Sequence, residues 1–287
     1  MSSKYWGRWG ADDERGALNR ITQESIMRAV GTVQSGDAIS LAVDIVPGGG
    51  PHFKGRSPMQ HFMTRHGGDY AAGLKEPGFG FADDYVLLAT HGTTHLDALS
   101  HVWRDGLMWN GISANTVTSR GAARCGMEKV GPIVTRAVYV DLADEEATAE
   151  RAISVDELVS AVAATGISPS DGDALMVRTG WLSRWRDGRA SEEHWTGLDA
   201  ECAEWIDEQG FVWVGADNIA VEYGPSPDPS DAAPLHVELI RNRGIYLVEL
   251  LDLEPLRDLG RSEFMVTLAP MPLVGGVGSP VNPVALL

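Results

Sequence analysis

Cysteine is scarce in this sequence, which has two, Cys125 and Cys202, in 287 residues. Two cysteines cannot build a disulfide framework, and by themselves they cannot supply a structural zinc cluster. So low a cysteine content fits the reducing cytoplasm, where we expect the protein to reside.

Basic residues are also few, because 23 lysines and arginines stand against 40 aspartates and glutamates, a formal net charge of -17. A field of this sign repels the phosphate backbone of nucleic acids and anionic lipid surfaces. We therefore expect no nucleic acid and no membrane as a partner. The net charge does not define the substrate, since a local cationic or metal site can bind an anion inside an acidic protein.

Long hydrophobic runs are missing as well. No stretch approaches the roughly 20 apolar residues of a membrane-spanning helix, and residues 1–10 lack the apolar core of a signal peptide. The sequence also lacks a dinucleotide fingerprint, a phosphate-binding loop, internal repeats and low-complexity tracts. Apolar residues make up 44% and charged residues 22%, as in ordinary globular proteins. We expect a single domain over residues 1–287 with a sizeable core.

Short apolar segments alternate with amphipathic ones, which predicts a mixed α/β protein. Ser154 and Glu157 form a capping box that begins a helix over 155–164. The patterns predict further helices over 22–34, 198–209 and 235–242, and strands over 38–46, 86–89, 138–142, 174–178, 211–215 and 245–250. Residues 57–84 are polar and glycine-rich, which indicates an irregular loop that lines a site or an interface.

Three histidines and one aspartate lie close together in the segment 91–101: His91, His95, Asp97 and His101. Imidazole nitrogens and carboxylate oxygens are the usual ligands of zinc and manganese, and a catalytic site needs about three protein ligands. His91, His95 and Asp97 make up such a set. His101, four residues past Asp97, is free to act as a base that does not bind the metal.

The spacing allows these side chains to converge on either type of backbone. On a helix His91 and His95 share one face, whereas in an extended segment His95 and Asp97 point to the same side. Gly92 and the threonines after it favour an irregular loop at the end of a strand. One histidine near a turn is more often a hydrogen-bonded polar group, but four ligand side chains in one segment favour a catalytic metal site.

Two more candidates lie downstream, His236 and Glu249. A carboxylate inside an apolar strand is costly unless it is paired or binds a metal. Glu249 fits that description, although an outward-facing strand position or a pairing with Arg241 or Arg243 fits equally well. Trp103 and Trp181 lie near the segments that carry the site and are candidates for substrate contact.

The segment 91–101 resembles the signature His-x-Gly-Thr-His-x-Asp-x-Pro-x-His of the cyclase family, which includes bacterial kynurenine formamidases and isatin hydrolases. His91, Thr94, His95, Asp97 and His101 match it in register. Gly92, Thr93 and Leu99 depart from the signature, and these departures resemble a longer-chain branch of the family rather than the formamidases. Further similarity covers most of the chain from about residue 85 to 260, at 178–181, 214–217, 234–236 and 244–249.

The resemblance implies a swivelling β/β/α cyclase-like fold with a mixed sheet and flanking helices, assembled as a homodimer or homotetramer. Residues 1–84 then form an N-terminal segment with substrate-lining loops, and 85–260 the metal-binding core. It also implies that His91, His95 and Asp97 hold a divalent ion. In binuclear members of the family, the residues that match His236 and Glu249 complete a second metal position. Isatin hydrolase looks like a mononuclear member. We therefore expect one or two ions of Mn or Zn per subunit.

A metal-dependent hydrolase is the function that we predict. The metal would lower the pKa of bound water and polarise the scissile carbonyl, with His101 as general acid/base. The expected substrate is a small cyclic or N-acyl compound with an amide or lactone bond, so the enzyme is an amidohydrolase acting on non-peptide C–N bonds or a lactone hydrolase. The alternatives are a metal-dependent cyclase or dehydratase, and a non-catalytic protein that binds a metal or small molecule.

Overall fold

The computed structural model of the protein describes residues 2–71, 78–228 and 230–287. Its described residues contain a nine-stranded mixed sheet in the order β1-β15-β13-β7-β9-β11-β12-β4-β14. The strands of this sheet are β1 Ala38–Ser40, β4 His95–Asp97, β7 Ile133–Asp141, β9 Ala174–Arg178, β11 Trp213–Ala216, β12 Tyr246–Glu249, β13 Glu263–Leu268, β14 Gly278–Pro280 and β15 Val284–Leu286. Small two-stranded sheets pair β2 Gln60–Arg65 with β3 Asp83–Leu87, β5 Val117–Thr118 with β6 Gly121–Ala122, and β8 Ala152–Ile153 with β10 Gly197–Leu198.

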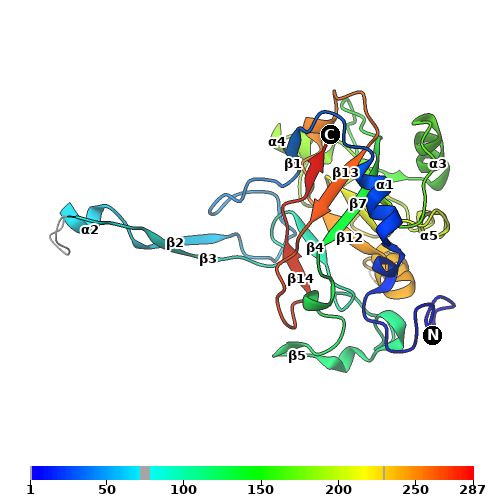
Figure 1. Ribbon diagram of the computed structural model, residues 1–287, viewed down its shortest axis with the longest axis horizontal. Coiled ribbons are helices and arrows are strands. Elements are labelled where there is room, and N and C mark those ends of the chain that lie inside the picture. Colours follow the sequence, from blue (N-terminus) through cyan, green and yellow to red (C-terminus); the bar gives the residue numbers. More distant parts are fainter. Residues whose placement is uncertain (1, 72–77, 229) are drawn as a thin grey trace.

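Most helices lie beside this sheet, whereas α2 Gly68–Ala71 lies at the outer end of the projecting hairpin of β2 and β3 (Figure 1). The others are α1 Gln23–Val30, α3 Val155–Ala164, α4 Trp181–Arg186, α5 Cys202–Glu208 and α6 Pro234–His236, which continues into a π-helix over Val237–Arg243. Short 3-10 turns cover Gly16–Arg20, Trp109–Gly111, Ala114–Thr116, Met127–Lys129 and Glu254–Leu256. In Figure 1, α3 and α5 lie to one side of the sheet. This mixed sheet with flanking helices confirms the predicted fold class.

The middle of the sheet is parallel, because β7, β9, β11 and β12 pair in parallel with one another. All five residues of β9 are buried. A parallel strand that is covered on both faces reads as a continuous apolar run, and this explains why the pattern predicted residues 174–178 without error. The carboxyl ends of these four strands meet at one edge, where Glu249 ends β12.

Capping boxes explain where the predicted helix boundaries agree with the structure. The Ser154 side chain accepts a bond from the backbone of Glu157, whose carboxylate accepts one from the backbone of Ser154, so α3 has its predicted ends. α1 begins after a similar box at Thr22, but it ends before Gly31 and is shorter than predicted. The strand predicted over 38–46 is also too long, because the chain leaves β15 after Ser40 and pairs next with Leu251.

The irregular loop predicted over 57–84 is wrong in part, because β2, α2 and the start of β3 lie within it, and residues 72–77 of that stretch lie outside the described residues. β2 and β3 pair in antiparallel register to form an arm, and every residue of both strands is exposed. Figure 1 shows this arm projecting far from the sheet, on the side away from α3 and α5. With both faces in water the arm lacks the alternation of apolar and polar residues by which a half-buried strand is recognised.

The described part of the chain contains no helix that is both long and apolar enough to cross a membrane.

Candidate metal centre

β4 carries two of the predicted ligands. His95 and Asp97 are alternate residues of this strand and point to the same face, and both are fully buried. β4 pairs with β12 on one side and with β14 on the other. The irregular loop expected here is therefore wrong for residues 95–97, because hydrogen bonds to two neighbouring strands hold them extended.

Glu249 reaches the same point from β12. It lies directly opposite His95 in the sheet register, with its Oε2 3.3 Å from His95 Nε2. His236, at the end of α6, places Nε2 3.1 Å from Oε1 of Glu249 and 3.6 Å from Oδ2 of Asp97. The structure thus joins the two downstream candidates to the segment 91–101, and Glu249 faces inward rather than outward.

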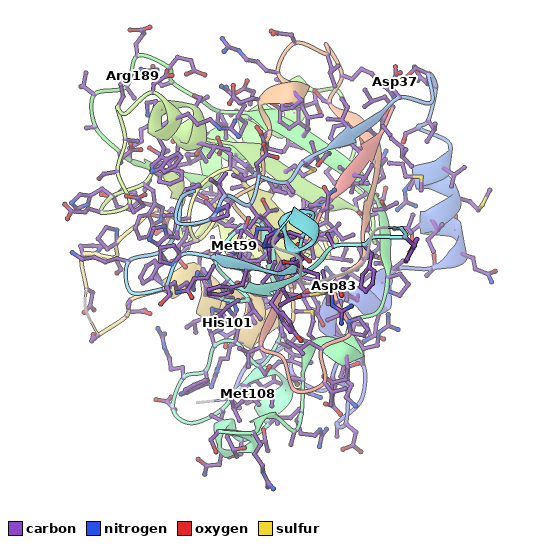
Figure 2. All side chains as sticks on the ribbon, turned by 90° about the vertical axis from the view of Figure 1, so that its left-hand side faces the viewer. Asp37, Met59, Asp83, His101, Met108 and Arg189 are labelled. Carbon is purple, nitrogen blue, oxygen red and sulfur yellow. The ribbon has the colours of Figure 1, made fainter. Side chains whose placement is uncertain are left out.

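His91 and His101 complete the cluster. His91 places Nε2 3.4 Å from Oδ1 of Asp97. The rings of His91 and His101 stack with their centroids 4.2 Å apart. Figure 2 looks at the face from which the arm projects, and His101 lies near the centre of that view. All five predicted ligands and His101 therefore converge on one site.

Several atoms of this cluster that could bind a metal are buried without a hydrogen-bond partner among the described residues. They are Nε2 of His91, Nε2 of His95 and both carboxylate oxygens of Asp97. Buried polar atoms are almost always paired, so a group of unpaired ones needs an explanation. A divalent cation explains it, because imidazole nitrogen and carboxylate oxygen with no thiolate is a ligand set for zinc or manganese. The residues fit a metal ion.

Charge at the cluster is balanced between carboxylates and imidazoles. Burial opposes ionisation of Asp97, yet His101 and His95 lower its pKa to about 2. Burial also opposes protonation of His95, but the carboxylates of Glu249 and Asp97 raise its pKa to about 9. Desolvation lowers the pKa of His91 to about 3. The raised pKa favours the protonated form of His95, so a metal bound at His95 would displace a proton.

Two histidines are oriented by bonds on the far side of the ring. Nδ1 of His95 donates to the carbonyl oxygen of Thr93 at 2.6 Å. Nδ1 of His236 bonds to the carboxylate of Glu222, which also accepts from the backbone N–H groups of Leu235 and His236. Such bonds turn Nε2 toward a metal. Glu222 was not among the residues predicted from the sequence, although an acidic residue between Val221 and Tyr223 is the same signal that indicated Glu249.

The ligands fall into two groups that share Asp97. His91, Asp97 and His101 form one, and His95, Asp97 and Glu249 form the other, with the ligand atoms of each within 4.8 Å of one another. His101 is thus within reach of a metal as well as being a candidate base. The geometry is compatible with one ion or with two.

A cavity of about 250 Å³ opens beside the cluster, and His101, His236 and Glu249 line it. Of the two predicted substrate-binding tryptophans, Trp103 lines a neighbouring cavity that also contains His101. Trp181 is fully buried, and its indole N–H donates to backbone carbonyls in a small second core, which leaves it no surface for a substrate. Trp195, from the same small core, lines the cavity instead.

Comparison with known proteins identifies the family of this chain. The family model described as "Putative cyclase" matches residues 22–223. A crystal structure described as a novel cyclase has 36% sequence identity and a TM-score of 0.90, covering 99% of this chain and 98% of that one. No curated protein matches.

Two more distant structures share the fold. Isatin hydrolase A from Labrenzia aggregata, bound to benzyl benzoate, has 17% identity and a TM-score of 0.67, with 90% of this chain and 94% of that one covered. A predicted metal-dependent hydrolase from Bacillus stearothermophilus has 18% identity and a TM-score of 0.54, with 87% and 97% covered. The family match over most of the chain, together with the first structure at 36% identity, shows that this protein belongs to the cyclase family.

Proposed function

We propose that this protein is a metal-dependent hydrolase that cleaves the amide or lactone bond of a small cyclic or N-acyl compound. The observation that carries the proposal is the group of buried, unpaired ligand atoms on His91, His95 and Asp97, next to a cavity that His101 lines. Structures of an isatin hydrolase and of a predicted metal-dependent hydrolase share the fold, which supports a hydrolytic reaction.

His91, His95, Asp97, His236 and Glu249 would hold the metal, either as one ion or as two that share Asp97. A divalent ion held there would supply a lowered pKa of bound water and polarisation of a carbonyl group. Manganese and zinc both accept this ligand set. Glu222 keeps the His236 ring in place, so that its Nε2 faces Asp97 and Glu249.

His101 is the general acid/base of this proposal. It lines the cavity and its ring lies against that of His91, so a bound substrate can reach it. In hydrolysis one O–H bond of water breaks and its oxygen adds to the scissile carbonyl carbon. The bond from that carbon to the leaving nitrogen or oxygen then breaks as His101 transfers the proton to the leaving atom. An imidazole suits this task because its ordinary pKa lies near neutrality, and burial lowers the pKa of His101, which favours the neutral form that accepts a proton.

Metal content tests the proposal first. Protein purified without added metal is analysed for bound elements, with Asp97→Ala and Glu249→Ala as variants. About one equivalent that is lost with D97A but kept with E249A supports a mononuclear centre, and about two, one of them lost with E249A, supports a binuclear one. Protein without metal in every preparation would sink the proposal.

Turnover is tested next on a panel of lactams, lactones and formamides, with chelator-treated protein as the control. Hydrolysis that stops on chelation and returns with manganese or zinc supports the proposal. Bound metal without turnover of any of these compounds contradicts it and favours a binding protein. The description of a similar structure as a novel cyclase favours cyclisation or dehydration as a second candidate. Hydrolysis would place oxygen from labelled water in the product, whereas cyclisation or dehydration would not.

A further inference from the structure

The cavity beside the metal centre combines polar and apolar residues. His101, His236 and Glu249 are among the polar ones, and most of the other lining residues are apolar, including Phe53, Trp195 and Ile219. A volume of about 250 Å³ is below the roughly 300–1,000 Å³ typical of pockets for drug-sized ligands. Its occupant is therefore a small compound with an apolar part.

Phe53 and Trp195 form an aromatic wall of the cavity, in which Trp195 is held in place by its neighbours. Phe53 and Trp195 meet edge to face, with ring centroids 6.1 Å apart and an angle of 72° between the planes. Trp195 and Gly224 exchange backbone hydrogen bonds of 2.9 and 3.2 Å. A β-carbon at Gly224 would lie 2.3 Å from Cζ2 of Trp195, so the indole occupies space that any other residue would fill. Together the two rings offer a surface for a flat ring of the substrate.

The arginine Arg56 lines the same cavity. Its Nη1 donates to the carbonyl oxygen of His91 at 2.8 Å, and its guanidinium carbon lies 5.3 Å from the centre of the Phe53 ring. Neither neighbour is an anion, and within the described ranges no carboxylate oxygen comes within ion-pair distance of Arg56. The two carboxylates of the cavity, Glu222 and Glu249, are engaged by His236 and His95.

Such an arginine is notable in a protein with 40 acidic and 23 basic residues. A guanidinium has five N–H donors in a planar fork that matches the geometry of a carboxylate. The bond to His91 uses one of them. The guanidinium lies next to the Phe53 ring and the backbone of His91 at the cavity, where its remaining donors can bind an anionic group of a ligand.

We propose that the cavity takes a small substrate with a flat ring and a carboxylate, and that Arg56 binds the carboxylate while the ring contacts Phe53 and Trp195. The position of the scissile bond near His101 rests on the function proposed above. The recognition of a carboxylate by Arg56 does not depend on it, because it is a matter of binding alone.

Binding of benzoate and of its neutral amide, benzamide, to metal-loaded protein tests this inference by titration calorimetry. Arg56→Gln should weaken benzoate binding by about tenfold or more, because a charge-assisted bond is lost, and leave benzamide binding unchanged. Arg56→Lys should retain part of the preference for benzoate, since it keeps the charge and a donor for the His91 carbonyl oxygen. Arg120→Gln, at an exposed position, removes the same charge outside the cavity and should change neither affinity.

Metal content is measured in every variant. An undiminished preference for benzoate in R56Q means that the carboxylate binds at the metal or elsewhere, and this overturns the inference. A loss of that preference in R120Q as large as in R56Q overturns it as well, because long-range charge would then be the cause. Selective binding without turnover on the hydrolase panel would contradict the proposed function but not the inference. Turnover on the panel together with a preference for benzoate that is the same in R56Q and the wild type would support the proposed function and contradict the inference.

Discussion

Gly278 of β14 leaves no room for a side chain next to His91, because a β-carbon at position 278 would lie 2.3 Å from Nε2 of His91. Gly278 is also the residue opposite Asp97 in the sheet register. The glycine thus lets a neighbouring strand approach the ligand atoms closely. It lies far from the segment 91–101 in the sequence, and only the fold brings the two together.

We expect Gly278→Ala to weaken metal binding by about tenfold or more, as changes around metal ligands usually do. The methyl group must displace the His91 imidazole, while the backbone at this position suits alanine. Equilibrium dialysis against a metal buffer measures the affinity. Gly67→Ala on the arm, where a β-carbon meets nothing within 4 Å, is the matched control. Equal affinity in both variants would show that Nε2 of His91 is not a ligand.

Glu222 is expected to act through His236. Replacing it by glutamine removes the charge that holds Nδ1 of His236 and weakens the bonds to the backbone N–H groups of Leu235 and His236. We expect metal affinity to fall by about 10–100-fold. The same dialysis measures it, with Glu146→Gln at an exposed position as the control. Unchanged affinity in E222Q would argue against His236 as a ligand.

Substitution of His101 should affect turnover but not metal binding. As a general acid/base this residue should contribute about 10²–10⁴-fold to turnover, so His101→Asn should lower kcat by that factor. Metal content should stay close to that of the wild type. Elemental analysis alongside steady-state kinetics checks both. A parallel loss of metal would reassign His101 as a ligand of the group that it forms with His91 and Asp97.

The buried ion pairs of Asp207 in α5 should make the stability of the fold fall at acid pH. The Asp207 carboxylate accepts bonds from Arg8 at 2.7 and 2.9 Å and from Arg20 at 2.7 Å. Burial would raise the pKa of Asp207, but these two arginines outweigh it and hold the pKa below its ordinary value. The folded state therefore favours the charged form. This contribution to stability is present above the unfolded pKa of about 3.9 and is lost as the pH falls through the lower folded pKa.

Asp207→Asn should consequently lower the free energy of unfolding by about 2–3 kcal/mol at pH 7. The difference from the wild type should shrink as the pH falls from 4 toward the folded pKa. Urea titrations across this range measure it. Asp187→Asn breaks an exposed pair with Arg189 and should change stability by about 0.5 kcal/mol or less. A difference independent of pH would mean that packing, rather than the ion pair, is what the substitution disturbs.

The sequence predicted the metal ligands from one segment because their chemistry is local. His91, His95 and Asp97 have ligand atoms whatever the backbone, and their spacing allows convergence in a helix or a strand. The strand β9 was also predicted within its bounds, because a parallel strand buried on both faces has a continuous apolar run. The arm was not predicted, since strands with both faces in water carry no such pattern.

Only the tertiary structure decided the surroundings of these ligands. The register of β12 against β4 sets Glu249 opposite His95, and no spacing along the chain encodes that pairing. The same holds for Glu222 behind His236 and for Arg56 at the cavity. The sequence by itself determined which side chains can bind a metal, because that is a property of their atoms. Their partners and the space around them depend on contacts between distant segments, which exist only in the folded chain.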